Sequence, residues 1–136
     1  CARENAARNG LSQVVDCMAA NVFDLLPQLQ KGQYDFIILD PPAFTKSRQT
    51  TQRAMAGYKE INYRAMRLLP RGGYLATCSC SHFATEELFR KMLHAAAHDA
   101  GVQLRQIEAR QQSPDHPILW NVPETSYLKF YLFQVV

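Results

Sequence analysis

An acid, two prolines and an aromatic ring follow directly after a short apolar run. The run Phe36–Leu39 continues into Asp40-Pro41-Pro42-Ala43-Phe44. A short unbroken apolar run predicts a strand that is buried on both faces. Proline cannot continue a β-ladder, so Asp40 must stand at the carboxyl end of this strand, where open α/β sheets bind ligands. The stretch could clamp a planar polar ring, or it could be a plain turn with Asp40 as a cap.

Two thiols lie at the end of a later apolar segment, in Thr77-Cys78-Ser79-Cys80-Ser81-His82. If the two strands are neighbours, Cys80 and Asp40 project into one crevice. A thiolate that adds to carbon 6 of a pyrimidine makes carbon 5 nucleophilic enough to take a methyl group, and an acid at nitrogen 3 stabilises the adduct. The thiol has to be deprotonated, so nearby cations or a helix N-terminus should favour its thiolate form.

Each of these residues also has a structural interpretation. Cysteine is among the most buried residue types, so Cys78 is interpreted as a packing residue, and Cys80 taken alone would be as well. Both share a strand face and could bind a metal with His82, but no fourth ligand is evident, and we predict no metal site. A general-base role for His82 stays open beside a surface or capping role. Lys46 and Arg48 could contact phosphate or be solvated loop charges.

The elements that position these residues alternate between helix and strand. Helices are predicted over Ala2–Asn9, Asn21–Gln30, about Thr51–Leu69 and Thr85–Ala100, and strands around Val14-Val15 and over Tyr34–Leu39, Tyr74–Ser79, Val102–Ala109 and Tyr127–Val136. This alternation indicates an α/β layered sheet with parallel crossovers. The last two strands are joined by an irregular loop without a helix, so one terminal strand should be antiparallel.

The composition is that of one globular domain. The 136 residues are 47% apolar and 20% charged, which suffices for a hydrophobic core. No apolar run approaches the roughly 20 residues that span a bilayer, and no signal peptide is recognised, so we predict no membrane partner. The net charge of +3 fits a mild preference for anionic partners. The four cysteines match neither a disulfide nor a zinc spacing, which predicts reduced thiols in the cytoplasm.

Several motifs, spread over nearly the whole chain, occur together. They are Asp40-Pro41-Pro42-Ala43-Phe44-x-Lys46-Ser47, Gly57-Tyr58-Lys59-Glu60-Ile61-Asn62, Gly72-Gly73, Ser79-Cys80-Ser81, Asp115-His116-Pro117 and Pro123-Glu124-Thr125-x-Tyr127-Leu128-Lys129. The combination resembles class I S-adenosylmethionine-dependent methyltransferases, and among them the 23S ribosomal RNA cytosine-5 methyltransferases that carry an N-terminal PUA domain. The Asp-Pro-Pro motif alone is shared with many amino-group methyltransferases, and its combination with Ser-Cys-Ser is far more specific.

The resemblance implies a Rossmann-like class I methyltransferase sheet with helices on both faces and an antiparallel last strand. It implies that Cys80 is the nucleophile and that Asp40 is the acid that contacts the base. The residues implied to bind the substrate are Pro41, Pro42, Phe44 and Lys46, and those implied to bind the cofactor S-adenosylmethionine are Asn21 and Asp40. Asn21 stands where the family usually has an aspartate that contacts the adenine.

Part of the family's catalytic domain has no counterpart in the sequence. Such enzymes have a first strand with a Gly-rich turn for the methionine end of the cofactor, and a second strand ending in an acid for its ribose. Residues 1–136 are therefore interpreted as a partial methyltransferase catalytic domain, with the N-terminal strands and the PUA domain upstream. This part alone should bind the cofactor weakly and be inactive. Its open edge, beside the Asp40 strand, should pair in a homodimer or be disordered nearby.

The leading hypothesis is thus an RNA methyltransferase that modifies carbon 5 of a cytosine in ribosomal RNA. The target base would be flipped out or unpaired, because ring carbon 6 is inaccessible in a stacked helix. One alternative is a nitrogen-directed nucleic-acid methyltransferase in which Asp-Pro-Pro grips the amino group and Cys80 is structural. Another is a non-catalytic RNA-binding module that keeps the fold.

Overall fold

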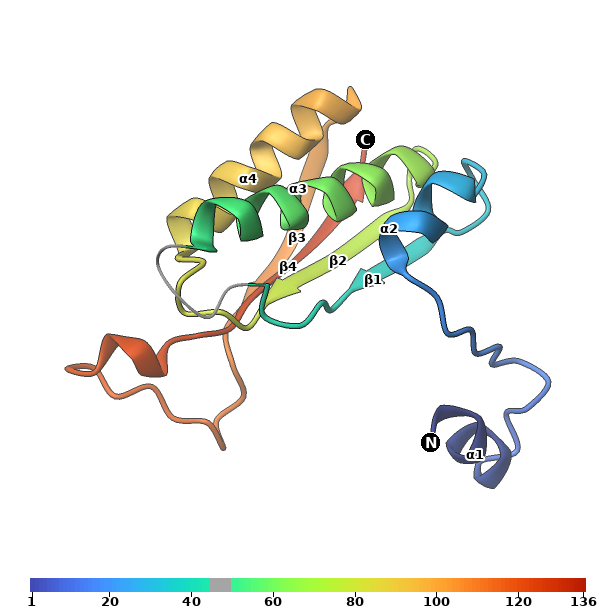
Figure 1. The fold of residues 1–136 in the computed structure, drawn as a ribbon, viewed down its shortest axis with the longest axis horizontal. Coiled ribbons are helices and arrows are strands. Elements are labelled where there is room, and N and C mark those ends of the chain that lie inside the picture. Colours follow the sequence, from blue (N-terminus) through green and yellow to red (C-terminus); the bar gives the residue numbers. More distant parts are fainter. Residues whose placement is uncertain (45–49) are drawn as a thin grey trace.

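One mixed β-sheet carries the fold in a computed structural model that describes residues 1–44 and 50–136. In these residues the strand order is β1-β2-β4-β3 (Figure 1). The strands are β1 (Phe36–Leu39), β2 (Tyr74–Ser79), β3 (Leu104–Arg110) and β4 (Lys129–Val135). β1 and β2 are parallel, whereas β4 runs antiparallel to both of its neighbours. The predicted α/β sheet with an antiparallel last strand is therefore confirmed.

Capping residues set the ends of the helices. The helices are α1 (Ala2–Arg8), α2 (Val22–Leu25), α3 (Thr51–Leu68) and α4 (Glu86–Ala100), with short 3₁₀ helices η1 (Leu26–Gln28) and η3 (Pro123–Thr125). Asn21 caps α2 and Thr85 caps α4, each accepting a hydrogen bond from a backbone N–H of the first turn. α4 ends at Gly101, whose φ of 67° is left-handed. Within the described part, each helix falls short of the length of apolar chain that crossing a bilayer requires.

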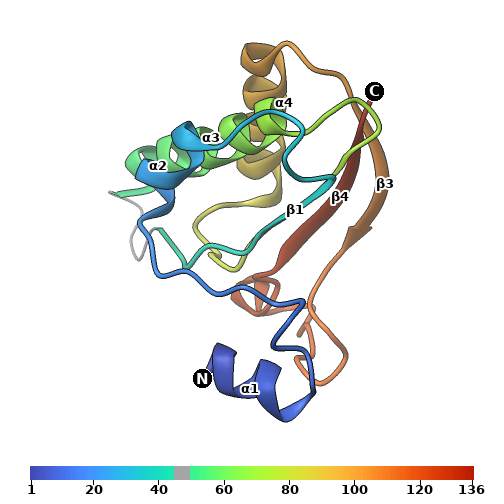
Figure 2. The same cartoon turned by 90° about the vertical axis from the view of Figure 1, so that its right-hand side faces the viewer.

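Helices α2, α3 and α4 lie on the same side of the sheet (Figure 2). β3 is parallel to β2, because both run antiparallel to β4. The crossovers β1–α3–β2 and β2–α4–β3 therefore both move across the sheet from β1 toward β3. Because crossovers are right-handed, two crossovers in the same direction place their helices on the same face of the sheet. A helix reaches the other face only where the strand order reverses. In the described residues, the expected cover on both faces is thus found on one face only.

The uncovered face changes the environment of β1. The apolar run predicts burial on both faces, but Phe36 is 49% exposed and Ile38 is 69% exposed, while Leu39 is buried on the helical side. β1 has β2 as its single neighbour among the described strands, so it is an edge strand, as predicted. The homodimer expected through this edge stays a prediction.

The strand predicted around Val14-Val15 is wrong. Residues 12–14 form turns, and Val14 and Val15 are 74% and 43% exposed. The N–H groups of both valines donate to the carbonyl oxygen of Leu11. A strand needs a neighbour that satisfies its backbone groups, and no described strand lies beside this segment. β-Branched residues supply strand propensity but cannot replace a pairing partner.

Aromatic rings join α3, α4 and β4 in the core. Tyr58 of α3 is fully buried and meets Phe89 of α4 edge-on, with 5.8 Å between ring centroids. Phe89 stacks in turn on Tyr131 of β4 at 6.3 Å. An exposed ion pair between Lys59 and Asp99, 2.6 Å apart, also links the two helices but adds little. Ring burial therefore holds α3 and α4 over β2 and β4 and fixes the end of β2.

Replacement of Thr77 by valine should stabilise this core. Thr77 lies in β2 at 1% exposure, and its Oγ1 has no hydrogen-bond partner in the described part of the chain. Valine keeps the β-branched shape and removes a buried hydroxyl that costs about 1–3 kcal/mol when unpaired. We expect Thr77→Val to raise the free energy of unfolding in urea by about 1 kcal/mol.

Ser79→Ala is the matched control, because it removes a buried β2 hydroxyl that does have a partner, and it should destabilise. A lower urea midpoint for Thr77→Val would show instead that the Thr77 hydroxyl makes a stabilising bond.

Candidate active site

The ends of β1 and β2 bring the two predicted catalytic residues to one edge of the sheet. Leu39 lies opposite Thr77 in the parallel pairing, so Asp40 and Cys78 follow as neighbours. Cys80 comes directly after the last residue of β2. Asp40 and Cys80 are both exposed at this edge. The expected placement of an acid and a thiol on adjacent strand ends is thus confirmed, whereas their catalytic roles stay predictions.

Asp40 is held by the thiol of Cys78. The Sγ–H group of Cys78 donates to Asp40 Oδ1 at 3.1 Å, and Sγ lies 3.4 Å from the Leu39 carbonyl oxygen. Burial raises the pKa of the Cys78 thiol to about 12, and the hydrogen bond to Asp40 acts in the same direction. Cys78 therefore stays protonated at neutral pH and orients the carboxyl group. The packing role predicted for Cys78 is incomplete, because the side chain also has this polar contact.

Cys80 stands between two buried serines. Ser79 is 0% exposed and Ser81 is 3% exposed, whereas Cys80 is exposed. The Ser79 hydroxyl donates to the Tyr58 hydroxyl at 3.0 Å and accepts a hydrogen bond from the Ser81 N–H at 3.4 Å. These bonds fix the backbone on both sides of Cys80, so that its thiol is presented outward from a rigid base.

Tyr58 connects the two halves of the site, a role that was not predicted. Its hydroxyl bonds with Ser79 and with the backbone of Phe44, and its ring centroid lies 4.7 Å from that of Phe44. Burial raises the pKa of the Tyr58 hydroxyl, which therefore stays protonated. A tyrosine at an inward helical position needs a partner for its hydroxyl, and that need is the signal that could have identified it.

The turn after β1 packs partly against the helices. The ring centroid of Phe44 lies 6.2 Å from that of Phe23, in addition to its contact with α3. Pro41 and Phe44 are half-buried, and Pro42 is exposed. One side of the Phe44 ring is therefore anchored by the protein, and its contact with a substrate stays a prediction. Lys46 lies outside the described residues.

Asn21 is engaged as the N-cap of α2. Its Oδ1 accepts from the Phe23 N–H at 3.1 Å, and its Nδ2 donates to Asp24 Oδ2 at 2.8 Å. A carboxamide oxygen has two lone pairs, so Oδ1 can still accept from an adenine amino group. Asn21 and Phe23 are exposed, and the contact of Asn21 with the cofactor stays a prediction. The described residues contain no Gly-rich turn after a strand that could hold the methionine end.

Lys129 is a second residue whose role was not predicted. It begins β4 at an inward position, 6% exposed, in the alternating series that continues with the buried Tyr131, Phe133 and Val135. Its Nζ donates to the Ser81 carbonyl oxygen at 2.5 Å and to the Tyr127 carbonyl oxygen at 2.8 Å. It also lines a cavity of about 540 Å³ beside the Cys80 loop. A lysine at an inward position of a strand is the signal that could have identified it.

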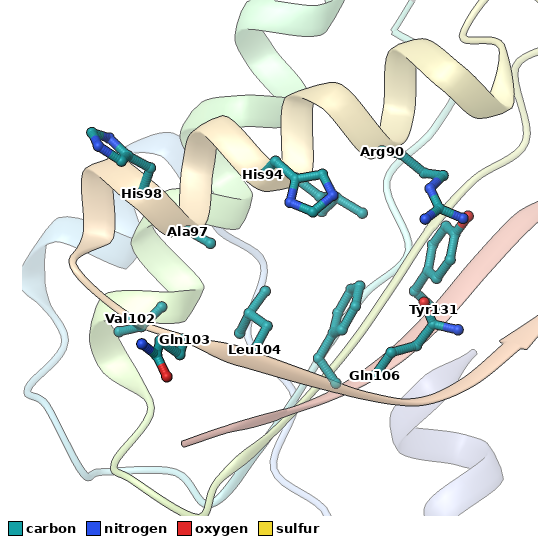
Figure 3. A pocket seen from close by; sticks show the side chains of 11 residues that line it. Arg90, His94, Ala97, His98, Val102, Gln103, Leu104, Gln106 and Tyr131 are labelled. Carbon is teal, nitrogen blue, oxygen red and sulfur yellow. The ribbon is translucent and has the colours of Figure 1, made fainter.

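A separate cavity of about 500 Å³ lies between α4 and the strands β3 and β4 (Figure 3). Arg90 and His94 reach toward it from α4, whereas His98 points away, and Leu104 and Tyr131 line the sheet side. None of the predicted site residues that the structure describes lines this cavity. It is therefore not part of the site at the strand ends.

The described residues contain no group of three or more histidine, cysteine, aspartate or glutamate side chains arranged to hold a metal ion. The His82 ring lies against the ring of Phe83, with 3.9 Å between centroids. A role for His82 as a general base stays a prediction.

Iodoacetamide should alkylate Cys80 much faster than Cys78 at pH 8. With a thiol pKa of about 12, only on the order of 10⁻⁴ of Cys78 is thiolate at that pH. Cys78 is also half-buried, whereas Cys80 is exposed. Tandem mass spectrometry of the tryptic peptide that holds both residues distinguishes them. The peptide of a Cys80→Ser variant should stay unmodified, and equal labelling of both thiols would contradict the protonated, bonded state of Cys78.

Tyr58→Phe should destabilise the protein by about 1–2 kcal/mol, because it removes a buried hydroxyl and leaves the Ser79 hydroxyl without its acceptor. Urea unfolding measures the effect. Tyr63→Phe is the control in the same helix, since the Tyr63 hydroxyl accepts from Arg67 at the surface and should leave stability nearly unchanged. Equal stability of the two variants would mean that the Tyr58–Ser79 bond does not hold the loop.

The methyltransferase small domain family matches residues 1–103 of the chain. Two relatives bear the name ribosomal RNA large subunit methyltransferase I. The one from Klebsiella pneumoniae (strain 342) is 39% identical over 138 residues, covering 99% of this chain and 34% of the relative. The one from Pseudoalteromonas atlantica is 45% identical over 107 residues, covering 79% of this chain and 27% of the relative. The chain thus spans about a third or less of the length of these relatives.

Solved structures show the same fold. SMU.776, in a crystal structure complexed with SAH, matches with a TM-score of 0.73 at 18% identity over 98% of this chain and 36% of that chain. TrmN from Thermus thermophilus matches with a TM-score of 0.63 at 22% identity over 99% of this chain and 32% of that chain. At such identities the likeness concerns the fold alone, and it confirms the predicted Rossmann-like sheet.

Proposed function

Because the chain belongs to the methyltransferase small domain family of S-adenosylmethionine-dependent enzymes, we propose that it forms the substrate half of a ribosomal RNA methyltransferase. The names of its relatives support ribosomal RNA as the substrate. We further propose that the target is carbon 5 of a cytosine and that Cys80 forms a covalent adduct with the base.

The exposed thiol of Cys80, on the strand end next to the one that carries Asp40, is the observation that carries this proposal. The thiol stands on a loop whose flanking serines are buried and hydrogen-bonded, so it is held in place and still accessible. Asp40 is oriented through Oδ1 by Cys78, and within the described residues its Oδ2 is left for a ligand. An accessible nucleophile and an oriented carboxyl group on neighbouring strand ends suit addition to a pyrimidine ring.

The reaction then runs in two halves. The Cys80 thiolate forms a bond from Sγ to carbon 6 of the cytosine, and the electron pair of the 5,6 double bond becomes available at carbon 5. Asp40 at ring nitrogen 3 stabilises the charge of the adduct. Carbon 5 takes up the methyl group and then loses its proton to solvent at this exposed edge. The Sγ–carbon 6 bond breaks as the double bond returns, which regenerates the thiolate.

The cofactor, when bound, would supply the methyl group as the electrophilic carbon of a sulfonium ion and would leave as the neutral thioether. Asn21 would hold its adenine end through Oδ1, and Asp40 would stand near its reacting end. The contact between the rings of Phe23 and Phe44 links the α2 cap to the turn after Asp40, so the two ends of the cofactor site are mechanically connected.

The substrate would be a flipped-out or unpaired nucleotide, because carbon 6 must be open to attack. Pro41, Pro42 and Phe44 would shape the base pocket, and Lys46 would contact phosphate. A reactive thiol requires a reducing compartment, which supports action in the cytoplasm.

In a protein of the relatives' length, we propose that residues 1–136 are part of a catalytic domain that also has strands with a Gly-rich turn, and that a PUA domain accompanies it. The open edge of β1 offers backbone groups for such strands. A second copy of the chain is the other occupant that the edge could take. On either arrangement, this part alone should bind the cofactor weakly.

Trapping on RNA that contains 5-fluorocytosine tests the covalent step. Fluorine at carbon 5 cannot leave as a proton does, so the intact enzyme should stay bonded to the RNA. Cys80→Ala should abolish the adduct and lower 5-methylcytosine formation at least about 100-fold. Denaturing gels and nucleoside mass spectrometry measure the two effects.

The adduct should still form in the matched control Cys78→Ala, because Cys80 is unchanged, although the loss of the bond that orients Asp40 should slow its formation. Methyl transfer that survives Cys80→Ala would point to the nitrogen-directed alternative. RNA binding that is unaffected by Asp40→Ala, without any methyl transfer, would point to a non-catalytic module.

A further inference from the structure

Lys129 is a buried cation beside the loop that presents Cys80. Its side chain is 6% exposed, and its ammonium group donates to the carbonyl oxygens of Ser81 and Tyr127. Among the described residues, no carboxylate forms an ion pair with it. A buried charge without a paired counter-ion is costly, and such groups cluster at functional sites.

The ammonium group fixes the residue that follows Cys80. The Ser81 carbonyl oxygen accepts from Lys129 at 2.5 Å, and the Ser81 N–H donates to Ser79 Oγ at 3.4 Å. Both backbone polar groups of Ser81 are therefore bonded to side chains, one from β4 and one from β2. The Ser81 carbonyl oxygen also accepts from the Ala84 N–H at 3.2 Å, so Lys129 adds a bond from β4 to a turn that the backbone already closes.

The charge of Lys129 also acts on the nucleophile. Burial lowers the pKa of Lys129 to about 8, whereas attraction to Glu86 and to Cys80 raises it. The attraction to Cys80 indicates that the ammonium group of Lys129 lies near enough for its charge to reach the thiol. The ammonium form dominates below about pH 8, which includes neutral pH.

Other titratable groups among the described residues lie around this pair. Glu86, His82 and Glu124 line the same cavity as Lys129, and Tyr58 and Cys78 interact with Cys80 from α3 and β2. Asp40 follows the neighbouring strand β1 at the same edge of the sheet. Tyr58 and Cys78 stay protonated at neutral pH, because burial raises the pKa of each. Among the described residues, Lys129 is thus a buried group whose positive charge can oppose the negative charge of a Cys80 thiolate.

We propose that Lys129 is a positioning residue for Cys80, which holds the loop through the Ser81 carbonyl oxygen and favours the thiolate form by its positive charge. This role deepens the function proposed above and rests on Cys80 being the nucleophile. Alkylation of Cys80 measures it without methyl transfer, so the two proposals can fail separately.

The rate of Cys80 alkylation by iodoacetamide, followed from pH 6 to pH 10 in the intact enzyme, tests the proposal. Lys129→Met removes the charge and keeps the length of the side chain. At pH 7 it should lower the rate about fivefold. Above about pH 9 the rates should converge, because Lys129 itself has lost its proton there. If Lys129→Met lowered the alkylation rate of Cys80 by the same factor at every pH, the role of Lys129 would be purely structural and the proposal would be overturned.

Lys129→Arg separates charge from shape. A guanidinium group does not lose its proton in this pH range. The variant should therefore recover part of the rate at pH 7 and keep its advantage over Lys129→Met above pH 9. Lys59→Met is the control for loss of a lysine, since Lys59 pairs with Asp99 at the surface, and it should match the wild type.

Glu86→Gln tests the same electrostatics without touching a buried residue. Glu86 raises the pKa of Lys129, so Glu86→Gln should lower the pH at which Lys129 loses its positive charge. The alkylation rates with and without Lys129 should then converge at a lower pH. Glu87→Gln is the matched control in the same first turn of α4. An unchanged pH profile for Glu86→Gln would overturn the proposal even if Lys129→Met failed to fold.

The two proposals can fail separately. If the alkylation rate of Cys80 depends on Lys129 and no 5-methylcytosine forms, the methyl-transfer proposal fails and the effect of Lys129 on the Cys80 thiol stands.

Discussion

The parallel pairing of β1 with β2 determines where chemistry can take place in this protein. With Leu39 opposite Thr77, the two strands end together, and Asp40 and Cys78 become neighbours at the same edge. A shift of one residue would turn every side chain of a strand to the other face and separate this pair. Helix α3 makes the crossover between these strands, and its buried Tyr58 bonds with the end of β2. The crossover that creates the pairing therefore also supports the site.

Around Cys80 the protein places polar groups where a hydrophobic core would ordinarily be. Tyr58 comes from α3, Ser79 from β2 and Lys129 from β4, and all three are buried and bond with one another or with the Cys80 loop. Satisfied buried networks of this kind add rigidity, whereas an incomplete one is costly. The loop is thus specified by three elements that are distant in sequence, and its geometry depends on the assembled sheet rather than on local turn preferences.

Local sequence patterns predicted where the strands end, but they did not predict which residues pack or bond around those ends. The prolines after Asp40 and the apolar run Tyr74–Ser79 are properties of single segments, and they predicted the positions of Asp40 and Cys80 at strand ends. Burial of β1 on both faces and a strand at Val14-Val15 both require neighbours that a local pattern does not contain, and both predictions were wrong. The bond from Cys78 to Asp40 depends on register, and the bond from Lys129 to Ser81 depends on β4 lying beside β2. Neither can be read from one segment alone.

The position of β4 in the sheet imposes an order on biosynthesis. β4 follows β3 in the chain but lies between β2 and β3, so β3 has no partner until β4 has left the ribosome. A nascent chain can form the β1–α3–β2 unit early, while α4 and β3 must wait. The bond from Lys129 to the Cys80 loop forms only when β4 pairs with β2. Cys80 would therefore reach its final setting only after β4 has joined the sheet, and a chain in which β4 is not yet paired would lack the bond from Lys129.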